Sequence, residues 1–222
     1  MPLLFLAAII WLLLHLGLAG TRLRDEVAAR IGDRGFRGLF SILSIIVIIF
    51  LGSSYNHASR TLVWVAPLWL RWLLVLVMLP ASILFVGSVA APNPTMIGGE
   101  RVSEPRGLMR VTRHPMLWSF ALWAIVHMIA TGDTASLLFF GTFLVTALAG
   151  MPSIDAKTAR RDPERWQRLA ASTSIVPGAA IVSGRSHVAA GDIGWVTLLG
   201  GLVLWLVMLF AHSSVIGVSP LG

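Results

Sequence analysis

Six long apolar runs decide what this chain can fold into. They lie at about residues 2–20, 38–55, 64–90, 115–131, 134–150 and 193–215. A helix needs about 20 mostly apolar residues to cross the hydrocarbon core of a bilayer, and it satisfies its own backbone polar groups there. The runs therefore predict an all-α integral membrane bundle of about six transmembrane helices, which we interpret as a single domain over residues 1–222.

The composition agrees with a membrane protein and narrows its chemistry. The chain is 56% hydrophobic and 12% charged, whereas soluble domains are about 25% charged. A net charge of +7 is typical of nucleic-acid binding, but the basic residues fall between apolar runs and lack interleaved aromatic residues, so no nucleic acid is expected. Cysteine is absent, which excludes disulfides, thiolate catalysis and thiolate haem ligation.

The basic residues predict how the bundle crosses the membrane. Of the 17 lysines and arginines, 15 fall in the segments 22–37, 101–113 and 157–185. The positive-inside rule places these segments in the cytoplasm and both termini outside. The first run lacks the basic start of a signal peptide, so we interpret it as a retained helix. We expect a multi-pass protein of the bacterial inner membrane with periplasmic termini, in contact with membrane lipids.

Local signals predict how the helices are connected. Gly132 suits the left-handed residue after a helix and Asp133 suits the cap of the next, which predicts a tight helical hairpin. The run 64–90 contains two prolines and is expected to be kinked. The segment 151–192 is predicted to be a cytoplasmic loop, and residues 155–171 within it resemble an amphipathic helix lying on the membrane surface.

Histidines inside the apolar runs are the main candidates for chemistry. His15 and His127 stand among apolar residues, where ionisable side chains are costly and often mark a site. Two neutral imidazoles from different helices suit a b-type haem, in which both histidines would be iron ligands. Alternatively, each imidazole hydrogen-bonds a neighbouring helix. His212 is a reserve ligand, whereas His57 and His187 are expected to be solvent-exposed.

The sequence places the two candidate ligands, His15 and His127, at different depths in the membrane. If the fourth helix begins where its apolar run begins, His127 lies about 18 Å along it, while His15 lies about 8 Å from the cytoplasmic end of its own helix. Helix tilt, or a fourth helix that starts deep in the membrane, must remove this difference if the two imidazoles bind one iron.

A second cluster of candidates lies where the fourth run begins. The triplet Arg113-His114-Pro115 has the form of a helix start, with proline at the first helical position. Free amides at a helix N-terminus together with Arg110 and Arg113 would bind an anion such as a haem propionate, a phosphate or a carboxylate. Alternatively, these arginines reach the phosphates of lipids.

Three stretches of the chain resemble a known family. They are WLLLHLGLAGTRLRDEVAARIGDRGFRGLFSILS, GLMRVTRHPMLWSFALWAIVH and RWQRLAASTSIVPGAAIVSGR. They are similar to the NnrU family of bacterial membrane proteins, to which the plant ζ-carotene isomerases belong, and span about residues 15–185. The resemblance implies a haem b enzyme in the plant branch, where a redox-dependent change of axial ligation exposes iron that isomerises a cis double bond of a polyene. Bacterial members are associated with nitrite and nitric oxide metabolism in denitrification.

Carried over by motif, the resemblance implies His15 and His127 as axial ligands and an apolar isoprenoid-like molecule as a partner. The chain departs from the plant pattern at two places. Ala124 stands where the plant proteins have a cysteine, and a further plant histidine is replaced near Val102. Ligand switching through sulfur is therefore excluded.

A more distant resemblance points to another class of enzyme. Arg113-His114-Pro115 with Trp118, followed by an ERW motif and Pro177, is similar to membrane methyltransferases that act on isoprenylcysteine or phospholipid. Such an enzyme would bind S-adenosylmethionine near this corner. The third alternative is a non-catalytic haem carrier or assembly partner. The oligomeric state stays open, a homo-oligomer included.

Overall fold

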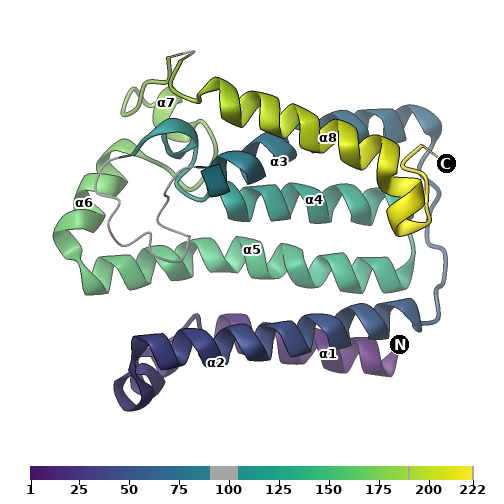
Figure 1. Cartoon of the computed structure of the whole chain (residues 1–222), viewed down its shortest axis with the longest axis horizontal. Coiled ribbons are helices and arrows are strands. Elements are labelled where there is room, and N and C mark those ends of the chain that lie inside the picture. The colour runs from purple at the N-terminus through teal and green to yellow at the C-terminus, as the bar shows by residue number, and fades with distance from the viewer. Residues whose placement is uncertain (91–104, 190, 222) are drawn as a thin grey trace.

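The computed structural model describes residues 1–90, 105–189 and 191–221, and this part of the chain is helical apart from its connections (Figure 1). Val102 lies outside the described residues. In chain order the helical elements are α1 (Pro2–Leu12), the π-helix η1 (Leu13–Leu18), α2 (Leu23–Asn56), α3 (Leu68–Ala90), the 3₁₀ turn η3 (Gly107–Arg110), α4 (Pro115–Thr131), α5 (Thr134–Arg161), α6 (Pro163–Ser172), α7 (Ala179–Val182) and α8 (Trp195–Ile216).

The all-α membrane bundle is confirmed. Helices α2, α3, α5 and α8 are long and apolar enough to cross a membrane, and the shorter apolar helices Pro2–Leu18 and Pro115–Thr131 bring the bundle to about six crossings. The termini lie at one end of the bundle, and the basic beginnings of α2, η3 and α6 lie at the other (Figure 1). This arrangement has the polarity that the charge pattern predicts, while the assignment of the two ends to periplasm and cytoplasm stays a prediction.

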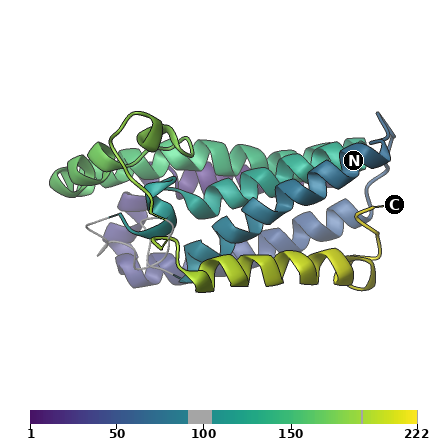
Figure 2. The same cartoon turned by 90° about the horizontal axis from the view of Figure 1, so that it is seen from above.

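The helices follow one another across the bundle in a simple order. Helix α1 packs against α2 and α5, α4 packs between α5 and α3, and α8 packs against α3 (Figures 1 and 2). Helices α1 and α4 therefore contact different sides of α5 and run in opposite directions (Figure 1). This order decides which of the membrane histidines can meet.

The predicted hairpin between α4 and α5 is confirmed. Gly132 ends α4 in the left-handed conformation with φ +64°. Asp133 caps α5, because its side chain accepts hydrogen bonds from the amides of Ala135 and Ser136 at 3.0 and 2.9 Å. The chain before α3 is fastened to the same corner, where the amide of Val63 donates to the Gly132 carbonyl at 2.7 Å.

Three predicted boundaries are wrong. The helix expected over 64–90 begins only at Leu68, because the preceding chain is extended and the Trp64 indole donates to the Ile129 carbonyl at 2.9 Å. The basic segment 22–37 belongs to α2, which bends at Gly32. The amphipathic stretch 155–171 is not one helix, because Asp162 ends α5 and caps α6.

Helix α5 also extends further than its apolar run. It continues to Arg161, so the predicted loop 151–192 starts with eleven helical residues. Two polar contacts dock this extension on the end of η1: the Ser153 hydroxyl donates to the Gly20 carbonyl at 2.8 Å, and the Lys157 ammonium donates to the Ala19 carbonyl at 2.7 Å. Tertiary hydrogen bonds therefore stabilise a helix beyond the membrane run.

Glycines bring α3 and α8 close together, which gives a test of the packing. A Cβ atom on Gly201 would lie 2.6 Å from the Ile83 Cα atom of α3. We expect Gly201→Ala to push the helices apart and to destabilise the protein by about 1–3 kcal/mol. Gly52→Ala is the matched control, since nothing lies within 4 Å of its Cβ position on α2. Equal thermal unfolding midpoints in detergent for both variants would contradict this packing.

Candidate cofactor site

His127 lies in an aromatic environment near the C-terminal end of α4. Its ring centre lies 5.1 Å from that of Trp123, 4.8 Å from that of Phe140 and 6.3 Å from that of His212. Its Nδ1 donates to the Trp123 carbonyl at 2.7 Å. Because a carbonyl only accepts, Nδ1 carries the proton, and the neutral ring keeps a lone pair on Nε2. Metal-ligating histidines are oriented in this way.

His15 has the same tautomer on the other side of the bundle. It lies in the π-helix η1, and such segments are frequent at functional sites. Its Nδ1 donates to the Trp11 carbonyl at 3.0 Å, and its ring stacks on Trp11 with centres 3.8 Å apart. The expected alternative of hydrogen bonds to neighbouring helices is wrong for the Nδ1 atoms of both histidines, because each partner belongs to the histidine's own chain segment.

His15 and His127 each keep a lone pair on Nε2, but the structure does not bring the two rings together. Among the described residues no ring contact joins them. Phe143 of α5 lies between their neighbours instead, with its ring centre 5.2 Å from that of Trp11 and 5.4 Å from that of Trp123. Trp11 also donates to the Thr146 hydroxyl and Trp123 also contacts Phe140, on either side of Phe143 along α5.

The depth of the two imidazoles follows from this contact. His15 lies four residues beyond Trp11 toward the basic end, and His127 lies four residues beyond Trp123 toward the other end. The imidazoles therefore lie toward opposite ends of the bundle, with the His15 ring centre 3.8 Å from that of Trp11 and the His127 ring centre 5.1 Å from that of Trp123. Two axial nitrogens bound to one metal at about 2 Å each lie only about 4 Å apart. Axial ligation by His15 and His127 together stays a prediction that this arrangement does not satisfy.

The basic corner at the start of α4 is occupied by the chain's own carboxylate. Arg113 Nε donates to Asp155 Oδ2 at 3.0 Å, and His114 Nε2 lies 2.9 Å from Asp155 Oδ1. His114 is 1% exposed, and its buried Nδ1 has no partner among the described residues. Because a carboxylate only accepts, His114 Nε2 carries a proton and donates to Asp155. The Arg113 guanidinium also lies over the Trp166 ring at 4.9 Å.

Arg110 is also paired with a carboxylate of the chain itself. Its guanidinium donates to the Asp192 carboxylate at 2.6 Å, with both side chains partly exposed. A propionate or phosphate would have to replace the carboxylates of Asp192 and Asp155 to reach Arg110 and Arg113. The predicted anion site and the methyltransferase alternative at this corner therefore stay predictions. Sequence reasoning missed both aspartates, because they lie 82 and 42 residues from the arginines they bind.

The segment after α6 folds back on the bundle. The amide of Arg113 donates to the Ser174 carbonyl at 3.0 Å, and the Trp118 indole donates to the Ile175 carbonyl at 2.8 Å. These bonds fix the start of α4. His57 and His187 are exposed, as expected.

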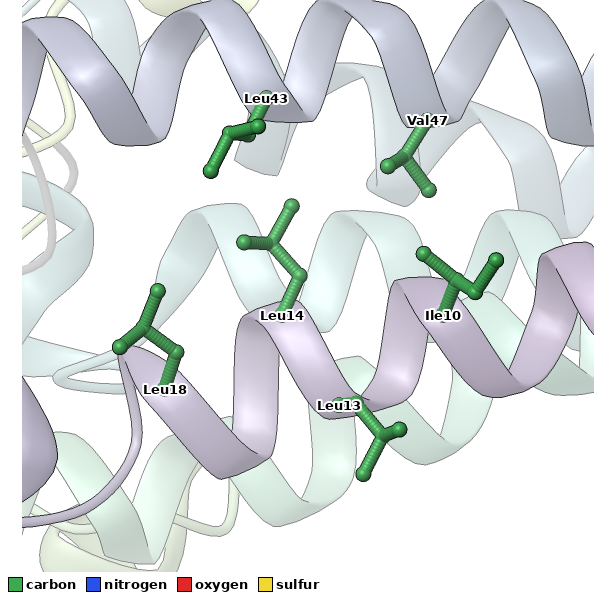
Figure 3. A pocket seen from close by; sticks show the side chains of 6 residues that line it. All are labelled: Ile10, Leu13, Leu14, Leu18, Leu43 and Val47. Atoms are coloured by element: carbon green, nitrogen blue, oxygen red, sulfur yellow. The ribbon is translucent and has the colours of Figure 1, made fainter.

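An apolar groove opens between α1, η1 and α2 (Figure 3). It has a volume of about 320 Å³ and is lined by Ile10, Leu13, Leu14, Leu18, Leu43 and Val47. Small-molecule sites measure about 300–1,000 Å³, so the groove accommodates part of a long apolar molecule rather than the whole. His15 follows the lining residue Leu14 directly in the chain.

An apolar helical bundle with imidazoles in its interior and ion pairs at one end defines a multi-pass membrane protein. The family model described as NnrU protein matches residues 3–220, and the chain therefore belongs to the NnrU family. This confirms the resemblance seen in the sequence.

Two curated relatives have a named activity. The chain is 27% identical over 192 residues to the chloroplast 15-cis-zeta-carotene isomerase of Arabidopsis thaliana, covering 80% of this chain and 49% of the relative. It is 25% identical over 195 residues to the enzyme of the same name from Zea mays, covering 81% and 50%. The chain thus spans about half the length of these relatives. No solved structure gives a significant match.

Proposed function

We propose that this protein is an isomerase of the bacterial inner membrane that acts on a cis double bond of a polyene or related isoprenoid. The observation that carries the proposal is the similarity of four fifths of the chain to two relatives named as carotene isomerases. The groove between α1, η1 and α2 supports it, because its lining side chains are all apolar and a polyene offers only apolar surface to bind. The positive-inside rule favours periplasmic termini in this proposal.

We further propose haem b as the cofactor, with His127 as one iron ligand. Support comes from the free lone pair on His127 Nε2, from the aromatic rings of Trp123 and Phe140 beside it, and from the absence of cysteine in the sequence. When bound, haem iron supplies a redox-active electrophile. The chain's own residues hold the imidazole: Trp123 fixes its tautomer through the carbonyl and covers it with the indole.

The groove residues would position the substrate. Leu14 and Leu18 of η1 face Leu43 and Val47 of α2 across the opening (Figure 3), so an apolar chain between them displaces no hydrogen-bonded water. Polyenes dissolve in the hydrocarbon core, and an opening between two membrane helices lets such a substrate enter from the bilayer.

Turnover of a cis-polyene tests this proposal. Purified protein with haem, reduced under anaerobic conditions, is expected to convert a 15-cis carotene to the trans isomer, which chromatography resolves. His127→Ala is expected to abolish conversion, and His57→Ala, at an exposed histidine, is the matched control.

Two results would contradict the isomerase. Protein that binds haem but leaves the carotene unchanged would be a haem carrier or an assembly partner, such as one acting in denitrification. Conversion that persists at the full rate in His127→Ala would show that this imidazole does not hold the catalytic group.

A further inference from the structure

The first membrane segment ends in an unusual helical turn. Residues Leu13–Leu18 form the π-helix η1, and the amide of Ala19 donates to the Leu14 carbonyl, five residues back, at 3.1 Å. Turns of this kind are rare, usually occur singly and are frequent at functional sites, so contacts from outside the helix have to favour this one over a regular α-helical turn. Those contacts come from α5.

Helix α5 holds the end of this π-turn with two side chains. The Ser153 hydroxyl donates to the Gly20 carbonyl at 2.8 Å. The Lys157 ammonium donates to the Ala19 carbonyl at 2.7 Å. The last carbonyls of a helix have no partner within the helix, and a cationic donor near them also interacts favourably with the helix dipole. The two side chains therefore supply from outside the hydrogen bonds that the end of the π-turn lacks.

The same face of α5 also holds the chain before the π-turn. The Trp11 indole donates to the Thr146 hydroxyl at 3.0 Å. Thr146, Ser153 and Lys157 are spaced seven and four residues apart, which places all three on one face of the helix. Polar side chains are costly in an apolar bundle unless they are paired, and each of these three is paired with the segment 11–20. His15 lies between the two ends that they hold.

The π-turn in turn forms one wall of the apolar groove. Leu14 and Leu18 of η1 both line the groove (Figure 3), and His15 follows Leu14 directly. Ala19 links this wall to α5, because its carbonyl accepts from Lys157 while its amide donates to the Leu14 carbonyl. A side chain at the end of α5 thus acts on the groove through a single residue.

We infer that Ser153 and Lys157 are positioning residues for the groove, because they hold the π-turn that forms its wall. This inference rests on the proposed function, in which the groove positions a polyene, and adds to that site two residues that lie beyond the apolar run of α5. Relaxation of a π-turn to a regular turn shifts the helix by one residue, which is a rotation of about 100°. Loss of both donors would therefore change the wall that Leu14 and Leu18 form.

Binding of a polyene tests the inference without any turnover assay. Protein purified from haem-supplied cells is immobilised and equilibrated with a 15-cis carotene in micelles, and the retained carotene is extracted and measured by chromatography. The double variant Ser153→Ala/Lys157→Met removes both donors. If the groove wall is then in place only about a tenth of the time, the apparent Kd for the carotene rises about tenfold.

The matched control makes the same kinds of change on the same stretch of α5. It is the double variant Thr158→Val/Arg160→Met. The Thr158 hydroxyl donates to the Ile154 carbonyl of its own helix at 2.9 Å, and Arg160 is exposed. This variant also loses one hydroxyl and one positive charge, but it leaves the bonds to η1 intact, so it is expected to keep the wild-type Kd.

A spin label separates positioning from general stability. The chain has no cysteine, so Leu18→Cys supplies a single labelling site on the π-turn. With α5 otherwise unchanged, the nitroxide is expected to give one immobilised spectrum. With Ser153→Ala/Lys157→Met, a second, mobile component is expected at temperatures well below unfolding. Ser153→Thr and Lys157→Arg each keep a donor and are expected to restore the immobilised spectrum, which covers the case in which the double variant does not fold.

The results that would contradict the inference differ from those that would contradict the proposed function. A label equally immobile with and without the two donors, or an unchanged carotene Kd in the folded double variant, would overturn the positioning role and leave the isomerase proposal standing. Wild-type protein that retains no carotene would overturn the proposed substrate and with it the role of the groove, whatever the label shows.

Discussion

Replacing Asp155 with alanine is expected to destabilise the folded protein by about 3–5 kcal/mol. Asp155 receives hydrogen bonds from Arg113 and from His114, whose side chain is 1% exposed. Without the carboxylate, the mostly buried guanidinium of Arg113 has no counter-charge. At roughly 2–4 °C per kcal/mol for a chain of this size, the unfolding midpoint in detergent should fall by about 6–20 °C.

The control for Asp155 is a pair of similar charge at the surface. Glu164 lies 3.9 Å from Arg168, and both side chains are exposed. Glu164→Gln is expected to leave the midpoint nearly unchanged, because exposed pairs contribute little. If Asp155→Ala were as stable as Glu164→Gln, the ion pair at the start of α4 would not hold this end of the bundle together.

Replacing Gly132, the glycine of the hairpin between α4 and α5, is expected to have the second large effect on stability. Gly132→Ala is expected to destabilise the protein by about 2–5 kcal/mol, combining the strain of a left-handed alanine with overpacking. A Cβ atom on Gly132 would lie 2.1 Å from the Trp64 carbonyl oxygen, and this backbone is fastened to the hairpin by hydrogen bonds. Neither chain segment can move without breaking them.

Gly178→Ala separates the two contributions. Gly178 has φ +77° but nothing within 4 Å of its Cβ position, so this variant carries only the conformational cost of about 1–2 kcal/mol. Thermal or denaturant unfolding of the two variants measures the difference. An effect of Gly132→Ala no larger than that of Gly178→Ala would mean that the chain before α3 does not pack on the hairpin.

The sequence predicts those parts of the fold that rest on local signals. Apolar length identifies the crossings, and Gly132 with Asp133 identifies the hairpin, because each needs only neighbouring residues. The extension of α5 is different. Its apolar run ends near residue 150, but Ser153 and Lys157 dock on the end of η1, and no local pattern reveals that contact.

Local signals likewise predict only part of the candidate site. The apolar setting of His15 and His127 singles them out in the sequence, and their tautomers suit ligation. Which imidazoles meet depends on the order of helices across the bundle, which places α5 between α1 and α4. The sequence held His212 only in reserve, although its ring is the one that lies beside His127.

The absorption spectrum of the purified protein tests the central proposal, that this bundle holds haem at His127, most directly. Protein from haem-supplied cells is expected to show a Soret band with low-spin visible bands, and His127→Ala should lose the haem or change its spectrum, whereas the exposed-site variant His57→Ala should match the wild type. Wild-type protein that is monodisperse and colourless, or a Soret band unaltered in His127→Ala, would contradict the proposal.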